Sequence, residues 1–350
     1  MITLQQVAQA AGYSLATVSY ALRDDKRIRP ETRARIQAIA RELGYRPNPR
    51  FASLMAHIRR SRPVAAGERI AFVWVHTGQA ESAADPFLAR VFAGARKRAE
   101  SLGYRLEPFW TSETRLRDRR LSEVLASRGI VGVLLSPVMH EAEVTLDFAW
   151  EHFAPAVIGN ARWIPELHHA GHHHYLAMRL TLEKLAQAGC RRPMAILEGE
   201  VNERARRAWQ AAFLVYHPTP AAAHELLWLG LGESARQTTR RIQAARPDAL
   251  IVSEEGLLDQ LARRRIKIPC SRIVTLHWTS HRSDLGGVDQ SYDLIAANAV
   301  DLVVSQLNSN ETGVPALPRL LLFSGRWVDP GARPAVAVAP AITPPVSPGR

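Results

Sequence analysis

The sequence has 350 residues, of which 47% are hydrophobic and 22% charged, a balance typical of a globular protein with two or three domains. No run approaches the roughly 18 to 20 apolar residues that a membrane span requires, and two isolated cysteines, Cys190 and Cys270, supply neither a disulfide framework nor a four-ligand metal site. The first residues show neither a charged leader nor an apolar secretory stretch, so we expect a cytoplasmic protein without metal or cofactor.

The positive charge is concentrated at the N-terminal end. The formal net charge is +12, and residues 1–62 hold twelve Arg and Lys against four Asp and Glu, which is +8 of that total. A basic end of this kind favours contact with a polyanion, most simply nucleic acid. The alternative on charge alone is a solvated basic tail.

The same segment is patterned as helices, which argues against a tail. Apolar residues recur at helical spacing at Leu4, Val7, Ala8 and Ala11. Thr3 begins a capping box with Gln6, and Gly12 suits the left-handed position that ends a helix. Ser14 then caps a second helix that we expect to run to about Arg23.

A third helix is expected from Pro30 to Gly44, with its apolar face at Ile36, Ile39, Ala40 and Leu43. Three short helices with a tight turn after the first predict a helix-turn-helix module. The small side chains of the first two helices allow a close approach, so that the second helix projects into a major groove. Thr17 and Ser19 carry hydroxyls that suit phosphate contacts.

Residues 2–48 carry, in order, Thr-Leu-x-x-Val-Ala, Ala-Gly-x-Ser, Thr-Val-Ser, Glu-Thr-Arg and Leu-Gly-Tyr-x-Pro-Asn. This series resembles the DNA-binding headpiece of the LacI/GalR family of bacterial transcriptional regulators. The resemblance implies a helix-turn-helix headpiece at residues 1–48 and these DNA-contacting residues: Thr3, Ser14, Leu15, Ala16, Thr17, Ser19, Tyr20, Arg23, Asn48 and Leu54.

The base-reading positions implied by the resemblance are Leu15, Ala16 and Tyr20. The family commonly has arginine in the place of Tyr20, and arginine binds guanine through two hydrogen bonds, whereas tyrosine offers one hydroxyl and a ring. We therefore expect an operator half-site that differs from the usual one. The alternative for Leu15 and Tyr20 is plain packing.

Residues 49–62 correspond to the hinge helix of the family, which wedges a leucine, here Leu54, into the minor groove and kinks the duplex. Pro49 and Phe51 depart from the family pattern and leave the start of this helix open. The alternative is a linker with an incidental leucine.

From residue 69 onward, short apolar runs alternate with helix-length amphipathic stretches, which predicts an α/β fold with parallel sheets. The expected strands are 70–75, 130–138, 155–159, 194–197, 249–253 and 272–278. The expected helices lie near 87–101, 114–128, 175–188, 202–214 and 293–307.

This region resembles the two-lobed, periplasmic-binding-protein-like (type I) effector domain of the same family, through LAQAGCRRPMAIL and the segment from GVDQSYD to RWVDPG. The resemblance implies an effector-binding and dimerisation domain at 63–331, with three strands crossing between lobes that clasp a small ligand, commonly a sugar or nucleoside. We expect one lobe at about 63–160 with 290–320 and the other at 161–289 with 321–331. The Pro/Ala-rich stretch 332–350 is expected to be disordered.

Four effector contacts are implied by the same resemblance: Arg206, Ser253, Glu254 and His277. Arg206 stands three residues before Trp209, where the family usually has Arg-x-x-Gly, and a guanidinium there binds a hydroxyl or carboxylate. His277 replaces the aspartate with which the family commonly binds sugar hydroxyls, which argues against a simple neutral sugar. The alternatives are a surface ion pair for Arg206 and a buried structural histidine for His277.

Five histidines crowd residues 168–174. They are a candidate site for zinc or nickel, but no Cys, Asp or Glu lies among them, so we expect no metal. Solvated loop histidines or a pH-sensitive cleft are the alternatives.

The function expected from all of this is a transcription regulator, a repressor, that binds a pseudo-palindromic double-stranded DNA operator as a homodimer under the control of a small, sugar-like effector. The competing interpretations are a solute-binding protein and a sugar-processing enzyme, each with an attached DNA-binding module. The sequence contains no Walker loop, GxSxG, HExxH or GxGxxG motif that would favour an enzyme. No membrane partner is expected.

Overall fold

The computed structural model describes residues 4–22, 28–45, 68–112, 118–139, 141–231, 234–268, 270–279 and 284–331. Four residues expected to contact DNA lie outside these ranges: Thr3, Arg23, Asn48 and Leu54. The hinge helix expected at 49–62 and the disordered tail expected at 332–350 also lie outside them.

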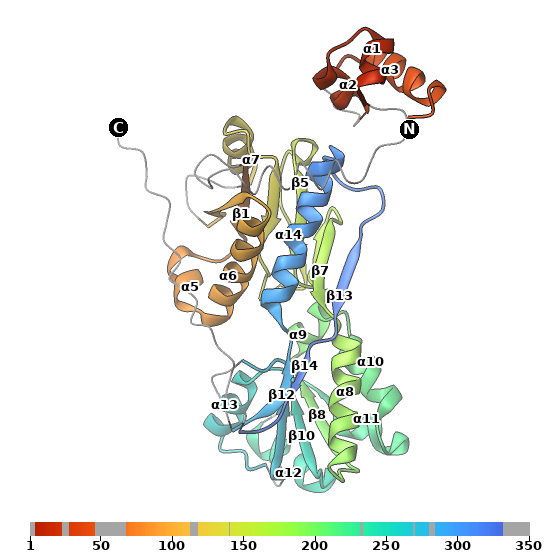
Figure 1. Ribbon diagram of the computed structural model, residues 1–350. Helices are drawn as coiled ribbons and strands as arrows, with labels where there is room; N and C mark the ends of the chain where they lie inside the picture. Colours follow the sequence, from red (N-terminus) through yellow and green to blue (C-terminus); the bar gives the residue numbers. More distant parts are fainter. Residues whose placement is uncertain are drawn as a thin grey trace.

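The N-terminal unit consists of three helices: α1 (Leu4–Ala11), α2 (Leu15–Leu22) and α3 (Pro30–Glu42) (Figure 1). Gly12 ends α1 with a left-handed φ of 72°, and the Ser14 hydroxyl oxygen accepts a hydrogen bond from the Thr17 N–H at 3.1 Å, which caps α2. Pro30 stands in the first turn of α3, where its missing N–H has no partner to lose. The turn, the cap and the helix start all confirm the prediction from the sequence.

These helices pack around a small core of their own. Its centre is formed by Val7, Val18 and Ile36, each of which is fully buried. Around them lie the alanines that let the helices approach closely: Ala8, Ala11, Ala21 and Ala40. The described part of this unit is therefore a helix-turn-helix module with a small hydrophobic core.

The first lobe is built on a six-stranded parallel sheet in the order β13-β7-β5-β3-β1-β2. The strands are β1 (Glu68–Trp74), β2 (Tyr104–Trp110), β3 (Gly132–Leu135), β5 (Ala154–Ile158), β7 (His168–His172) and β13 (Leu320–Phe323). Two long helices, α6 (Pro86–Ser101) and α14 (Tyr292–Ser309), cover one face of the sheet, and an apolar core lies between them and the strands. A second apolar core lies on the other face of the sheet. It is enclosed by α7 (Asp118–Ser127), η2 (Trp150–His152) and the small sheet of β4 (Glu143–Thr145) and β6 (Arg162–Ile164). The short helix α5 (Gln79–Ala84) precedes α6.

The second lobe has a six-stranded sheet in the order β14-β12-β11-β10-β8-β9, in which only β14 is antiparallel to its neighbour. The strands are β8 (Pro193–Leu197), β9 (Leu227–Leu229), β10 (Ala249–Val252), β11 (Arg272–Thr275), β12 (Gly286–Asp289) and β14 (Arg326–Val328). The helices are α8 (His174–Gln187), α9 (Gly199–Arg204), α10 (Ala208–Tyr216), η3 (Pro220–Ala222), α11 (Ala223–Leu226), α12 (Ala235–Ala245) and α13 (Gly256–Arg263). Apolar side chains of sheet and helices share one core.

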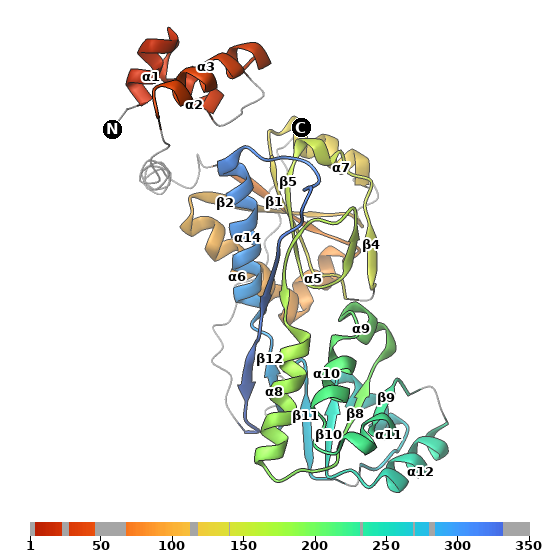
Figure 2. The ribbon, with the colours of Figure 1, turned by 90° about the vertical axis from the view of Figure 1, so that its right-hand side faces the viewer.

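The chain passes between the lobes three times: from β7 into α8, from β12 into α14, and from β13 to β14 (Figures 1 and 2). The first sheet extends to His172, beyond the boundary expected at residue 160, because β7 pairs with β5. Strand β13 also belongs to the first lobe, although the second was expected to resume at residue 321, because it pairs with β7.

The helix expected near 202–214 is broken in two. Arg206 and Arg207 both have left-handed backbones, with φ of 52° and 54°, between the end of α9 and the start of α10. Because an L residue rarely adopts this conformation within a helix, the chain turns here instead of continuing. The turn directs the buried Trp209 toward the space between the lobes.

Among the described residues, no helix is both long enough and apolar enough to cross a membrane.

Candidate functional site

Helix α2 places the residues expected to meet DNA. Val18 and Ala21 are buried toward the other helices, whereas Thr17 and Tyr20, also three residues apart, lie half-buried on a neighbouring face. The hydroxyls of Ser14 and Thr17 are 2.8 Å apart and form a hydrogen bond with each other. Of Leu15 and Ala16 the structure describes only the backbone, in the first turn of α2. A role of these residues and of Ser19 in DNA contact stays a prediction.

A cavity lies between the two lobes and is lined by residues of both. Its walls come from the carboxyl ends of parallel strands in both sheets and from the first turns of nearby helices, which is where α/β proteins bind ligands. The lining residues are Pro137, Val138, Met139, Gly159, Asn160, His174, Val201, Arg204, Trp209, Glu254, His277, Gln290 and Tyr292.

Arg204 is the cationic residue of the cavity wall, and it bridges the two lobes. One guanidinium nitrogen donates a hydrogen bond to the Met139 carbonyl of the first lobe, and another lies 3.2 Å from a Glu254 carboxylate oxygen of the second lobe. The two charged side chains are 14% and 30% exposed, so their opposite charges largely cancel within a partly buried pair. The wall therefore presents polarity without a net charge.

Buried polar atoms without a hydrogen-bond partner indicate which kind of ligand the cavity can bind. Within the described chain, the Trp209 indole N–H and the His174 Nδ1 atom are buried and have no hydrogen-bond partner. The two rings stack edge to face with centroids 4.5 Å apart. Because an unpaired buried N–H costs on the order of 1–3 kcal/mol, a ligand that accepts a hydrogen bond here regains that free energy. Burial raises the pKa of Tyr292 to about 12, so its hydroxyl stays protonated.

The histidine-rich stretch is a buried strand. His168–His172 form β7, between β5 and β13, and every residue of the strand is buried. Gly171 leaves room for the Asn160 amide, which donates to the His172 carbonyl at 3.0 Å and accepts from the His172 N–H at 2.9 Å. Solvated loop histidines are thus a wrong interpretation. Within the described ranges, no group of three or more His, Cys, Asp or Glu is arranged to hold a metal ion.

Burial keeps these imidazoles neutral. Desolvation lowers the pKa of His169 to about 4, with help from Arg206, and that of His172 to about 3, with help from His277. Desolvation also lowers the pKa of His277 to about 4 and that of His174 well below its ordinary value. These four imidazoles therefore stay uncharged near neutral pH.

We expect the protein to lose stability as the pH falls from 7 to 5. The pKa of a buried histidine is lowered by folding, so below about pH 6.5 the unfolded chain binds more protons, and each fully buried histidine costs about 2 kcal/mol of folding free energy at pH 5. Urea unfolding at the two pH values measures this loss. His169→Gln should make the loss smaller by a comparable amount, whereas His152→Gln, at an exposed histidine, should leave it unchanged. Equal losses in both variants and the wild type would contradict the expectation.

Only two of the four expected effector residues line the cavity. Glu254 and His277 line the cavity. Ser253 is fully buried behind it, and its hydroxyl oxygen accepts a hydrogen bond from the Glu198 N–H at 3.2 Å. Arg206 is exposed, on the turn between α9 and α10, and does not line the cavity.

Arg204 takes the place expected for Arg206. The sequence holds a signal for it, because Arg204 is three residues after the buried Val201 and so shares its helix face. The expected helix through 202–214 would have put Arg206 on another face, but the left-handed turn removes Arg206 from the helix altogether. His174, Trp209 and Tyr292 were also missed, because each stands in a first helical turn at a crossing or a break that the sequence pattern does not mark.

Comparison with known proteins agrees with this arrangement. The profile of the bacterial regulatory proteins of the lacI family matches residues 3–48. The HTH-type transcriptional regulator PtxS of Pseudomonas plecoglossicida is 29% identical over 215 residues, which cover 61% of this chain and 58% of PtxS. The match thus spans less than two thirds of that relative's own length.

Solved structures extend the likeness to the fold of most of the chain. A complex of the transcriptional regulator CelR with cellobiose aligns with a TM-score of 0.52 at 19% identity, over 94% of this chain and 99% of CelR. A LacI-family regulatory protein from Chloroflexus aggregans aligns with a TM-score of 0.53 at 16% identity, over 75% of this chain and 98% of that protein. The expected fold class, a helix-turn-helix headpiece with a two-lobed, periplasmic-binding-protein-like region of parallel sheets, is confirmed. Residues 3–48 thus match the lacI family of bacterial regulatory proteins, and most of the chain shares the fold of these solved regulators.

Proposed function

We propose that this protein is a transcription regulator, a repressor, that binds a pseudo-palindromic DNA operator as a homodimer and is controlled by a small molecule in the interlobe cavity. The observation that carries the proposal is the combination in one chain of a helix-turn-helix unit with a two-lobed region whose strand ends enclose a polar cavity. Neither part alone requires the other, and regulation by a ligand explains why they are joined. Such a protein acts on the chromosome, in the bacterial cytoplasm.

The DNA side of the proposal rests on helix α2. A single three-helix unit offers few contacts, so a two-fold dimer that reads two half-sites roughly doubles them. The proposed contacts are Thr3, Ser14, Leu15, Ala16, Thr17, Ser19, Tyr20, Arg23 and Asn48, with Leu54 as the minor-groove wedge. The proposed division is a headpiece at 1–48, a hinge at 49–62, the effector region at 63–331 and a tail at 332–350.

The effector side of the proposal rests on Arg204, Glu254, His277, Trp209 and Tyr292. His277 in place of an aspartate argued against a simple neutral sugar, but Arg204 and Glu254 neutralise each other and the lining histidines are uncharged. The cavity therefore suits a compact, uncharged ligand with several hydrogen-bonding groups. The CelR structure contains cellobiose, which supports a sugar-like ligand here. The effector acts by binding one arrangement of the lobes more tightly than the other.

Selection from random duplex DNA tests the proposal. The full-length protein should enrich a pseudo-palindrome, and the affinity for it should fall steeply with salt because phosphate contacts release counterions. Tyr20→Ala should change the preferred base at one position of each half-site, and Tyr216→Ala, at an exposed tyrosine of α10, should enrich the wild-type sequence. Enrichment of no sequence, or of one without two-fold repetition, would contradict the proposal.

A further inference from the structure

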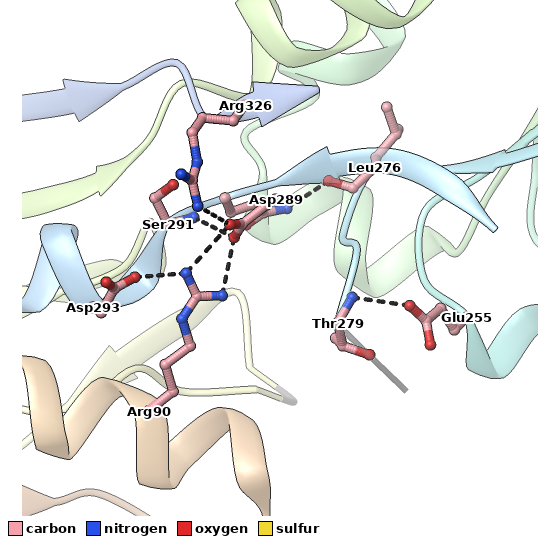
Figure 3. Close-up of polar contacts among 9 residues, drawn as sticks. Arg90, Glu255, Leu276, Thr279, Asp289, Ser291, Asp293 and Arg326 are labelled. Atoms are coloured by element: carbon pink, nitrogen blue, oxygen red, sulfur yellow. Dashed lines mark hydrogen bonds and ion pairs between the residues drawn. The ribbon is translucent and has the colours of Figure 1, made fainter. Parts of the chain in front are cut away.

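The second crossing between the lobes begins at a buried carboxylate with four hydrogen bonds. Asp289, the last residue of β12, has a side chain only 5% exposed. Its oxygens accept from two guanidinium nitrogens of Arg90 at 3.0 and 3.3 Å, from Arg326 at 2.9 Å and from the Ser291 N–H at 2.9 Å (Figure 3). Burial alone would raise the pKa of Asp289, but the hydrogen bonds from Arg90, Ser291 and Arg326 lower it below its ordinary value. The carboxylate therefore remains charged at neutral pH.

Arg90 reaches this carboxylate from the first lobe. It lies on α6, and one of its nitrogens also donates to the Asp293 carboxylate at 2.6 Å, in the first turn of α14 (Figure 3). A planar guanidinium with several fixed donors suits such bidentate and bridging contacts. One side chain of the first lobe thus holds both ends of the segment Asp289–Asp293.

Two residues inside that segment line the interlobe cavity. Gln290 donates its side-chain N–H to the Leu276 carbonyl at 2.8 Å and so stays on the second sheet. The Tyr292 ring contacts Phe87, three residues before Arg90 on α6, with centroids 4.7 Å apart, and Phe87 also contacts the cavity residue His277 at 5.1 Å. The first turns of α6 therefore hold one wall of the cavity by charge and by ring packing.

The three crossings meet at the same point. A Cβ on Gly325 would lie 2.8 Å from the Asp289 carbonyl oxygen and 2.9 Å from the His172 ring, so only glycine lets the third crossing pass between the other two. Gly325 also has a left-handed φ of 72°, which favours glycine. In so tight an arrangement, a displacement of one crossing is transmitted to the others.

We propose that Arg90 is the positioning residue that couples the interlobe cavity to the first lobe, by holding the Asp289–Asp293 crossing and with it the cavity residues Gln290 and Tyr292. The inference rests on the proposed function in taking the cavity as the effector site. A ligand that moves Tyr292 or Gln290 must then work against the Arg90–Asp289 pair, and the first lobe moves with the crossing. Arg90 thus determines how much ligand binding in the cavity shifts the first lobe, which follows the headpiece in the chain.

The chain supplies a matched control for the test. Arg98 lies two turns further along α6 and donates to Asp301 of α14 at 2.8 Å, so it joins the same two helices without reaching the crossing. The side chains of Arg90 and Arg98 are similarly exposed, at 37% and 40%. Replacing either by glutamine removes one charge and one ion-paired contact between α6 and α14.

Hydrogen exchange read by mass spectrometry on the full-length variants gives the answer. Arg90→Gln should speed exchange of the amides of residues 286–292 by about tenfold, since opening of the crossing no longer breaks the charged hydrogen bonds. Arg98→Gln should leave the exchange of this segment within about twofold of the wild type, even if both variants lower the melting temperature equally. A purely structural Arg90 would instead give the two variants the same pattern, and that result would overturn the proposal.

Arg90→Lys is measured beside them and keeps the test valid if the glutamine variant does not fold. Lysine keeps the charge but lacks the planar fork, so exchange in the segment should still rise clearly above the wild type. Wild-type protection in Arg90→Lys would show that a point charge suffices and would refute the proposed role of the Arg90 guanidinium. These measurements need neither DNA nor a ligand, so they can fail or succeed independently of the proposed function.

Discussion

Gly94→Ala is expected to destabilise the first lobe severely. Gly94 lies on α6 where this helix crosses the start of α14, and a Cβ there would lie 2.4 Å from the Asp293 carbonyl oxygen and 2.7 Å from its Cα. The helix cannot retreat, because Leu88, Val91 and Phe92 fix its inner face in the core. Overpacking against backbone costs about 3 kcal/mol or more, a large share of the stability of a typical domain.

Urea unfolding followed by circular dichroism measures the effect. Gly256→Ala is the control, because Gly256 is also helical, at the start of α13, and a Cβ there meets nothing within 4 Å. It should leave the midpoint unchanged or raise it slightly, since alanine favours a helix by up to about 1 kcal/mol over glycine. A wild-type midpoint for Gly94→Ala would mean that α6 and α14 do not approach as closely as described.

Val18→Asp is expected to abolish DNA binding while leaving the two lobes folded. Val18 is fully buried in the headpiece core, and an unpaired buried carboxylate costs about 3–5 kcal/mol. A core this small supplies stability of about the same size, so the three-helix unit should unfold. The lobes have separate cores and should keep the wild-type melting temperature.

A footprint on the selected operator, with calorimetry of the full-length protein, reads out both effects. Gln9→Asp adds the same charge at an exposed position of α1 and should cost only a modest, salt-dependent part of the affinity. If Val18→Asp footprints the operator like the wild type, DNA is not held by the headpiece. If it melts the lobes as well, the two parts are not independent.

The headpiece could be predicted from sequence because each signal is local. Gly12 permits the turn, Ser14 caps the next helix and Pro30 begins the third, and no distant contact is needed for any of them. The central strands were found for a related reason: a parallel strand covered on both faces is a continuous apolar run, as in β1 and β10.

Strand β7 could not be predicted, because its burial is decided by its neighbours. His168–His172 is a polar run, yet it is enclosed between β5 and β13, with its imidazoles held neutral by desolvation. The edge strand β13 pairs with it from about 150 residues further along the chain. Such pairing leaves no periodic signal in the sequence.

Of the residues that line the cavity, the sequence indicated those that follow strands but not those whose place depends on distant contacts. Glu254 and His277 each stand two residues after an apolar strand, so their place at a strand end could be expected. Arg204 depends on the Met139 carbonyl, which belongs to the other lobe, and on the break after α9. Arg90 of α6 and Asp289 of β12 come together across the two lobes, and neither residue's sequence context indicates the other.

Titrating small molecules against the operator complex tests most directly whether the cavity governs DNA binding. Compounds are first chosen because they raise the melting temperature of the full-length protein and because Trp209→Ala, at the cavity wall, removes that effect. We predict that such a compound changes the operator affinity of the wild type by at least about fivefold, the lower end of ordinary allosteric coupling. A compound that binds the cavity by this criterion and leaves the operator affinity unchanged would contradict the claim that the cavity governs the headpiece.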